Sequence, residues 1–335
     1  MVDYNRKRKI GITTTVPVEV IYAGGAVPVD LNNIFINHPE RERLIARAEI
    51  DGYPRNVCRW IKGIYATAIE MEIEEVVAVM QGDCSNTHAL AETLQANGIR
   101  VIPFSYPYDG NRELLRREIE YLSMNIGVSD WIDVIAWKKR LDDIRKLAHR
   151  IDVLTWDENK VTGLENHIYL VSTSDFESDP TVFESKMRDF IHLAENRSPI
   201  QEEVRLAYIG VPPIFSDIYE VLEEYGARVV YNEVQRQFSM PYPTDDILEQ
   251  YAKYTYPYQV FNRIADISEQ IRIRNIDGII HYAETFCFRQ IEDIILRKEF
   301  DIPYIMIEGG ESFSVDARTK MRIQTFVEMI KRNSI

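Results

Sequence analysis

The chain has 335 residues, of which 45% are hydrophobic and 27% charged, so its length suits two domains plus an insertion and its composition is typical of soluble globular proteins. Its net charge of −14 argues against nucleic acid or an anionic membrane as the main partner, because both require clustered Lys and Arg. The basic start, Met1–Lys9, is not followed by the apolar run of a signal peptide, and no stretch has the roughly 18 apolar residues of a membrane span, so we expect a cytoplasmic protein.

Residues 10–33 are interpreted as an N-terminal loop. Three threonines precede Pro17, Glu19 stands in an otherwise apolar run, and Gly24-Gly25 allow a tight turn. If Glu19 is buried, we expect a raised pKa, as an acid–base group requires. The alternative is that Glu19 is a surface residue at the edge of a strand or helix.

The next residues predict a β-α-β unit and then a helical stretch. Residues 41–73 are predicted to be helical with a break near Gly52-Tyr53-Pro54. Strands are predicted at Val76–Met80 and Arg100–Phe104, with a helix over residues 86–96 between them, which favours a parallel sheet. Residues 111–202 show helical spacing without a convincing strand.

Alternation of strands and helices resumes in the second half of the chain. The predicted strands are Arg205–Ile209, Arg228–Tyr231, Gly278–Tyr282 and Pro303–Ile307, with helices over residues 216–225, 245–274, 288–298 and 318–331. The predicted fold class is therefore α/β, with two Rossmann-like, doubly wound parallel-sheet domains. We expect these domains over residues 1–110 and 203–335, separated by a mainly helical insertion over residues 111–202.

The only three cysteines of the chain are Cys58, Cys84 and Cys287. Cys84 and Cys287 each fall between a predicted strand and a predicted helix, and Cys58 falls near the start of a helical segment. Open α/β sheets bind ligands beyond the carboxyl ends of their strands, and helix N-termini lower the pKa of a thiol toward the thiolate that ligates iron. An odd number of distant cysteines fits a reducing compartment and gives no disulfide framework.

Three thiolates leave several possibilities open. They suit a [4Fe–4S] cluster, which usually has four cysteine ligands, so that one iron would stay open as a Lewis acid and electron donor. A zinc site is another option, although structural zinc usually uses closely spaced ligand pairs. Free cysteines also serve as small buried hydrophobic residues.

Several segments in order resemble the 2-hydroxyacyl-CoA dehydratase and benzoyl-CoA reductase family, in its alpha and beta subunits. The resemblance covers nearly the whole chain, including the Cys58 segment. The matching stretches are VPVEVIYAGGAVPVDL from Val16, GDCSNTHAL from Gly82, NHIYLVSTSDFESDP from Asn166, DGIIHYAETFCFRQIEDI from Asp277, IPYIMIEGGES from Ile302 and RTKMRIQTFVEMI from Arg318.

The resemblance implies a [4Fe–4S] cluster held by Cys58, Cys84 and Cys287, with substrate bound at the open iron. It implies that an ATP-dependent iron–sulfur activator supplies one electron, and that the substrate thioester is reduced to a ketyl radical anion, which expels the hydroxyl group. Glu19 is then the candidate acid–base residue, and Thr14 or Thr15 lines the same loop. The implied partners are a small-molecule substrate, for which an acyl-CoA is one candidate, and a second subunit in a homodimer or a heterodimer with a paralogous chain.

Two other functions remain open. The chain could be a non-redox iron–sulfur lyase or sulfur-handling enzyme that uses the open iron only as a Lewis acid. It could also be an electron-relay subunit that passes electrons to a paralogous chain.

Overall fold

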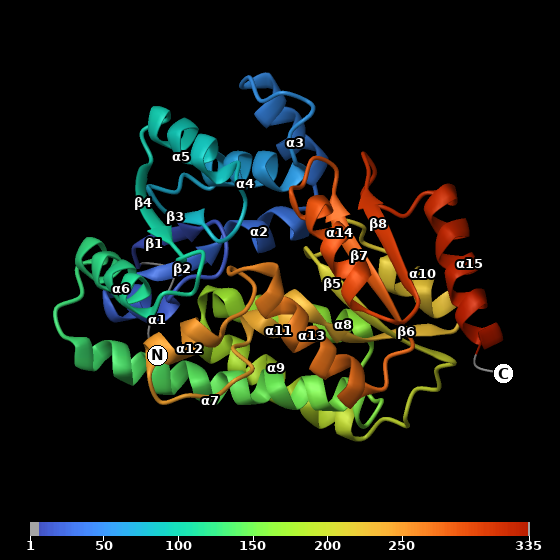
Figure 1. Cartoon of the computed structure of the whole chain (residues 1–335). Helices are drawn as coiled ribbons and strands as arrows, with labels where there is room; N and C mark the ends of the chain where they lie inside the picture. The colour runs from blue at the N-terminus through green and yellow to red at the C-terminus, as the bar shows by residue number, and fades with distance from the viewer. Residues whose placement is uncertain (1–6, 334–335) are drawn as a thin grey trace. The chain divides into compact units, whose positions relative to one another are not determined.

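The computed structural model describes residues 7–333, which form two compact units, each built around a four-stranded parallel sheet (Figure 1). Within that range, unit 1 comprises residues 7–146, 172–186 and 240–259, and unit 2 comprises residues 147–171, 187–239 and 260–333. The chain therefore passes from one unit to the other several times. Helices α7 (Trp131–Trp156) and α9 (Pro180–Glu195) each contribute residues to both units.

The sheet of unit 1 has the strand order β2-β1-β3-β4, and all its strands are parallel. The strands are β1 (Lys9–Ile12), β2 (Val27–Asp30), β3 (Glu75–Gln81) and β4 (Arg100–Ser105). The helical segments that lie wholly in unit 1 are α1 (Val18–Ala23), α2 (Leu31–Asn37), α3 (Arg41–Ile50), α4 (Arg59–Glu70), α5 (Thr87–Ala96), α6 (Arg112–Ile126), η2 (Ser172–Ser174), η3 (Phe176–Ser178) and α12 (Ile247–Lys253).

The sheet of unit 2 repeats this arrangement in the order β6-β5-β7-β8, again with parallel strands. The strands are β5 (Val204–Gly210), β6 (Ala227–Asn232), β7 (Gly278–Glu284) and β8 (Tyr304–Gly309). The helices are α8 (Gly163–Val171), α10 (Ile218–Glu224), α11 (Glu233–Phe238), α13 (Val260–Arg274), α14 (Arg289–Glu299) and α15 (Ala317–Asn333).

Helices cover both faces of the unit 2 sheet, because alternate residues of a strand point to opposite sides. Leu206 and Tyr208 pack with the apolar sides of α10 and α15. Ala207 and Ile209 belong to a second cluster with residues of α13 and α14. Unit 2 is thus doubly wound, and the predicted α/β class with two Rossmann-like domains is confirmed.

The predicted loop over residues 10–33 is wrong, because this segment contains β1, α1 and β2. Both strands have only four residues, and all four residues of β2 are buried, so neither shows the alternation that reveals a half-buried strand. Pro28 also argues against a strand in the sequence. The structure accommodates Pro28 because β2 is the edge strand, where a missing N–H costs no hydrogen bond within the sheet.

The prediction of a helical stretch over residues 111–202 is confirmed, since the structure has only helices and irregular segments there. By their contacts, α6 and the first part of α7 group with unit 1, and α8 groups with unit 2. Boundaries at residues 110 and 202 for separate domains remain a prediction. In residues 7–333, no helix is both long enough and apolar enough to cross a bilayer.

Gly210, which ends β5, is a specific test of the unit 2 fold. Its φ is +99°, and a Cβ there would lie 2.1 Å from the carbonyl oxygen of Tyr282. We expect Gly210→Ala to lower the free energy of unfolding by at least about 2 kcal/mol, from backbone strain and overpacking together. Denaturant unfolding measures this loss. Gly310→Ala is the control, because a Cβ there meets nothing within 4 Å, and an equal loss in both variants would contradict the explanation.

Candidate functional site

In unit 1, the predicted site residues other than Cys58 follow β1 and β3, two neighbouring strands whose connections leave in opposite directions. Such a switch point is where open α/β sheets bind ligands. The loop after β1 is tied to β3, because the Thr13 amide donates to the Val77 carbonyl oxygen at 3.3 Å and the Val79 amide donates to Thr13 Oγ1 at 3.0 Å. The loop with Thr14 and Thr15 therefore begins beside the strand that leads to Cys84.

Cys84 is half-buried between β3 and α5 and is held by a close backbone approach. Gly82 has a φ of +102°, and a Cβ there would lie 2.9 Å from the carbonyl oxygen of Pro257. The carbonyl oxygen of Cys84 accepts a hydrogen bond from the Thr87 amide at 3.0 Å, which fixes the cysteine just ahead of α5. The expected position of Cys84 at a strand–helix junction is confirmed.

Cys58 is the N-cap residue of α4, and only 6% of its surface is exposed. Its carbonyl oxygen accepts a hydrogen bond from the Lys62 amide at 3.3 Å. Both cysteines of unit 1 therefore precede the positive end of a helix dipole, which favours a thiolate.

Thr14 and Thr15 are buried, with 7% and 2% of their surfaces exposed. The Tyr106 hydroxyl donates to the carbonyl oxygen of Thr15 at 2.9 Å. The Tyr254 ring lies edge-on to Tyr106, with ring centres 5.8 Å apart, and burial raises the pKa of both tyrosines well above its usual value. The threonine loop is thus fixed among neutral tyrosine hydroxyls.

Glu19, in the first turn of α1, is completely buried, so the surface alternative is excluded. Its Oε1 accepts hydrogen bonds from Arg145 Nη1 at 2.8 Å and from Gln250 Nε2 at 2.9 Å. The Tyr251 hydroxyl lies 2.8 Å from Oε2 and 2.9 Å from the carbonyl oxygen of Val16. Both carboxylate oxygens therefore have partners.

The expected raised pKa of Glu19 is wrong. Burial does act to raise the pKa, but the charge of Arg145 and the hydrogen bonds to the carboxylate outweigh it, so the pKa lies below its usual value. The sequence interpretation counted the apolar neighbours in the chain and could not include an arginine 126 residues away. At neutral pH Glu19 is a carboxylate, not a proton donor.

Replacing Glu19 with glutamine should leave the buried Arg145 guanidinium with only the partly exposed Asp142 carboxylate, 2.9 Å from Nη1, as its counter-ion. We expect Glu19→Gln to lower the free energy of unfolding by about 2–3 kcal/mol at neutral pH, less than for a wholly uncompensated buried charge. A depressed pKa contributes stability above the unfolded value of 4.5 that is lost as the pH falls through the folded value, so the difference should shrink in acid. Urea unfolding at pH 7 and pH 4 measures both effects.

Glu113→Gln is the matched control for this experiment. Glu113 pairs with Arg117 at 3.3 Å, but both side chains are more than half exposed, so little stability should be lost. Equal losses in the two variants, or a loss from Glu19→Gln that does not depend on pH, would contradict a buried ion pair at Glu19.

In unit 2, Cys287 is half-buried between β7 and α14 and packs against the core below α10 and α15. Its amide donates to the Glu284 carbonyl oxygen at 3.0 Å, and its carbonyl oxygen accepts from the Gln290 amide at 3.2 Å. The preceding residue, Phe286, has a left-handed φ of 66° and is 55% exposed. Cys287 therefore also lies in a tight turn just before a helix, as predicted.

The Glu308–Ser312 segment after β8 approaches this turn closely. The Thr285 hydroxyl donates to the carbonyl oxygen of Gly309, and the buried Glu284 carboxylate accepts from the Tyr282 hydroxyl. A Cβ on Gly309 would lie 1.7 Å from Glu284 Oε1. Only glycine fits at this position, so the segment ends β8 in contact with the turn that carries Cys287.

His281 and His88 have different surroundings. His281 Nδ1 lies 2.8 Å from Asp293 Oδ1, and the imidazole is completely buried. Burial acts to raise the pKa of Asp293, but hydrogen bonds from His281, Tyr304 and Arg297 outweigh it and lower the pKa to about 2. His281 thus takes part in a buried hydrogen-bonded cluster, whereas His88 is exposed on α5.

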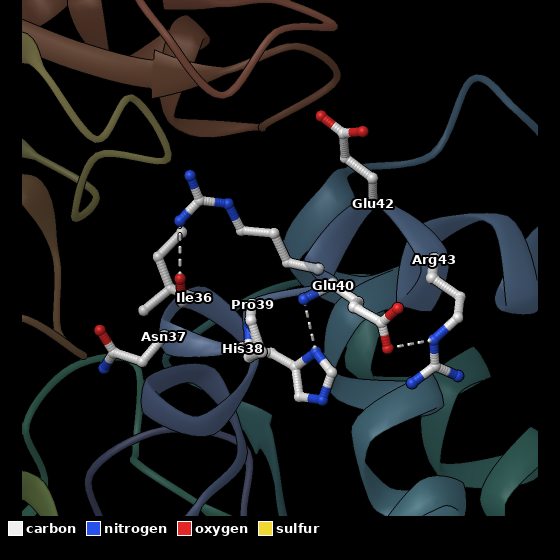
Figure 2. A pocket seen from close by; sticks show the side chains of 8 residues that line it. Ile36, Asn37, His38, Pro39, Glu40, Glu42 and Arg43 are labelled. Atoms are coloured by element: carbon white, nitrogen blue, oxygen red, sulfur yellow. Dashed lines mark hydrogen bonds and ion pairs between the residues drawn. The ribbon is translucent and has the colours of Figure 1, made fainter.

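A surface pocket of about 640 Å³ lies at the junction of α2 and α3 in unit 1 (Figure 2). Residues 36–43 line it, and none of them is a predicted site residue. Figure 2 shows the polar groups pairing within the pocket: the Arg43 guanidinium donates to Glu40 at 3.1 Å, and the Glu40 amide donates to His38 Nδ1 at 3.1 Å. With these charges balanced, the pocket offers no strong preference for an anion or a cation.

The three cysteines are divided between the units. Cys58 and Cys84 belong to unit 1 and Cys287 to unit 2. In residues 7–333, no group of three or more His, Cys, Asp or Glu side chains is arranged to hold a metal ion. Shared ligation by the three thiols stays a prediction from the sequence.

A comparison with protein families found one match along nearly the whole chain. The model of the 2-hydroxyglutaryl-CoA dehydratase, D-component, matches residues 13–330. The chain belongs to this family. A comparison with curated proteins found no match.

Membership in the dehydratase family confirms the resemblance seen in the sequence motifs. It makes the chain a 2-hydroxyacyl-CoA dehydratase-like subunit and, at this coarse level, a lyase-like enzyme. Proteins of this family are generally associated with iron–sulfur clusters and work with an activator and an acyl-CoA substrate.

Sequence reasoning on this dehydratase-family chain missed the three residues that surround Glu19. Arg145 comes from α7, and Gln250 and Tyr251 come from α12, which belongs to the segment over residues 240–259 that returns to unit 1. They lie 126 to 232 residues from Glu19 in the chain. No local pattern indicates such partners. A carboxylate in an apolar run does indicate that a partner must exist, because an unpaired buried charge is very costly.

Proposed function

We propose that this chain is a subunit of a 2-hydroxyacyl-CoA dehydratase in which Cys58, Cys84 and Cys287 hold a [4Fe–4S] cluster with one open iron. The family match over residues 13–330 is the observation that carries the proposal. When bound, the cluster supplies a low-potential electron, received from an ATP-dependent iron–sulfur activator, and an open iron position for substrate.

The chemistry of the three cysteines fits such a cluster. None of them forms a disulfide bond, and the thiolate is the form of cysteine that ligates iron. Each lies at or just before the N-terminus of a helix of ten or more residues: α4, α5 or α14. The aligned peptide dipoles of these helices stabilise negative charge, which a thiolate-ligated cluster carries.

Glu19, Thr14 and Thr15 are the proposed catalytic residues of unit 1. Glu19 enters the reaction as a carboxylate, because Arg145 lowers its pKa, so any proton transfer begins with Glu19 as the base. Its three hydrogen-bond donors fix its orientation. The buried threonines precede it in the loop after β1, where hydroxyl groups can bind a substrate oxygen.

Iron analysis tests the cluster directly. After anaerobic purification and reconstitution, we expect about four irons per chain and an EPR signal on one-electron reduction. Cys58→Ala, Cys84→Ala and Cys287→Ala should each lose most of the bound iron, because each removes one ligand. Ser85→Ala, next to Cys84 and exposed, is the control and should retain it. A protein that binds only zinc, or no metal, refutes the cluster.

Turnover tests the reaction class. With 2-hydroxyglutaryl-CoA, an ATP-dependent iron–sulfur activator, ATP and a reductant, we expect the substrate to lose water. Mass spectrometry of the acyl-CoA measures this loss. Omitting ATP or the activator should abolish it, because the electron must be delivered at low potential. Turnover without either would instead support the non-redox lyase. Absence of turnover with every 2-hydroxyacyl-CoA tested, in a protein with an intact cluster, would favour the electron-relay alternative.

A further inference from the structure

The η3 turn in unit 1 has an unusual backbone. Phe176, Glu177 and Ser178 have φ values of 57°, 51° and 60°, so three consecutive non-glycine residues adopt the left-handed conformation. Residues with a Cβ avoid this region, and successive examples are rarer still. Such a turn persists only where surrounding contacts hold it, and strained segments of this kind cluster at functional sites.

Hydrogen bonds tie the turn to β2 and α1. Oδ1 of Asp175 accepts from the Glu177 amide at 3.0 Å. The Ser178 hydroxyl donates to the carbonyl oxygen of Pro28 at 2.9 Å, and the Tyr22 hydroxyl donates to the carbonyl oxygen of Asp175 at 2.8 Å. Asp175 therefore connects to the turn through both its side chain and its backbone.

Asp175 is also linked, through the backbone amide of Asp30, to a second buried acidic residue at the end of β2. The amide of Asp30 donates to Asp175 Oδ2 at 2.8 Å, and the two residues are 2% and 3% exposed. Burial, reinforced by the charge of Asp30, raises the pKa of Asp175 to about 8, and burial also raises the pKa of Asp30. At neutral pH Asp175 therefore holds a proton, as expected for two carboxyl groups in one desolvated place.

Hydrogen bonds from the backbone amides of Asp30 and Glu177 act to lower the pKa of Asp175 but do not outweigh burial. Asp30 accepts hydrogen bonds from neutral groups of Asn32 and Ser174. Glu177 adds a further negative charge that raises the pKa of Asp175 and pairs with Lys186. The titratable and charged groups facing the pair from its neighbouring elements are Tyr22 of α1, Glu177 of η3, Lys186 of α9 and, across the Phe176 ring, Arg145 of α7.

The turn also supports the cation that binds Glu19. Phe176 is completely buried, and the guanidinium carbon of Arg145 lies 5.4 Å from the centre of its ring. Arg145 in turn donates to Glu19 Oε1 at 2.8 Å. A chain of direct contacts therefore runs from the carboxyl pair through Phe176 and Arg145 to Glu19.

We propose that Asp30 and Asp175 form a proton-dependent latch that holds the left-handed turn and thereby positions Arg145 against Glu19. While Asp175 is protonated, the pair carries at most one negative charge and the turn stays closed. When Asp175 loses its proton, the two buried negative charges repel each other. The remaining contacts then no longer suffice to hold residues 176–178 in the left-handed conformation. Asp30 and Asp175 act through other residues and are positioning residues.

The pKa of Asp175 is higher in the folded state than in the unfolded state. Such a group stabilises the folded state fully when the pH is below its unfolded-state pKa, and this stability is lost as the pH rises through its folded-state pKa. The latch should therefore open as the pH rises through about 8. Trp137 offers an internal reporter, because its ring stacks on Tyr22 at 4.6 Å and the Tyr22 hydroxyl donates to Asp175.

The test is hydrogen exchange of the whole chain, measured by mass spectrometry at pH 6 and pH 9 after correction for the intrinsic rate. We expect the amides of residues 176–179 and of α1 to exchange at least tenfold faster at pH 9, whereas β5 stays unchanged. Tryptophan fluorescence should show a transition between pH 7 and 9 that disappears in Trp137→Phe. Unchanged protection of residues 176–179 in the wild-type protein overturns the proposal, whatever the variants do.

Asp175→Asn removes the titrating group and should abolish the fluorescence transition. Asp179→Asn is the matched control, because the Asp179 carboxylate caps α9 directly after the turn and, in the described part of the chain, forms no hydrogen bond with Asp30 or Asp175. This variant should therefore retain the transition. If Asp175→Asn does not fold, Asp30→Asn is the second variant and should move the transition to lower pH. A transition of unchanged midpoint in Asp30→Asn overturns the latch. These readouts need no iron and no substrate, so they are independent of the proposed dehydratase activity.

Discussion

Parallel strands that all end at one edge of their sheet are the constraint on which the candidate site depends. In unit 1 this edge collects the loop after β1, with Thr14 and Thr15, and the loop after β3, with Cys84. In unit 2 it collects the turn after β7, with Cys287, and the segment after β8. Because the next element after Cys84 or Cys287 is a helix, the strand–helix connection itself places each of these cysteines next to a helix N-terminus.

The second physical determinant is how each buried carboxylate of unit 1 is compensated. Glu19 and Asp175 are both removed from water, and burial alone raises the pKa of each. Glu19 faces Arg145, so its pKa falls and it stays ionised. At Asp175 burial is the largest cause of the raised pKa, and the charge of Asp30 adds to it, so Asp175 keeps a proton. The two groups differ because Arg145 outweighs burial at Glu19, whereas Asp30 reinforces burial at Asp175.

The buried ion pair between Glu19 and Arg145 is not explained by stability alone. Desolvating two charges costs several kcal/mol per ion, and a well-packed apolar pair is often at least as stable. The proposed role of Glu19 as a catalytic base would give this pair a use besides stability. Membership in a dehydratase family gives that use a chemical setting, since removing water from a substrate requires groups that accept and deliver protons.

The sequence by itself determined the fold class, most helices and strands, the strand–helix positions of Cys84 and Cys287, and the family. The elements depend on local periodicity, which can be followed within a short stretch of the chain, and the family depends on short motifs and their order along the chain. It failed at β1 and β2, because four-residue strands that are nearly all buried carry no alternation and Pro28 argues against a strand unless its edge position is known.

Only the tertiary structure decided the protonation of the buried carboxylates. The apolar neighbours of Glu19 in the chain left open whether it is buried or at the surface, and its pKa depends on Arg145, Gln250 and Tyr251, which reach it from distant helices. The pairing of Asp30 with Asp175, 145 residues apart, is equally invisible in the sequence. Electrostatic interactions act through space, so a residue's position in the chain can predict its burial but not the charge that it will face.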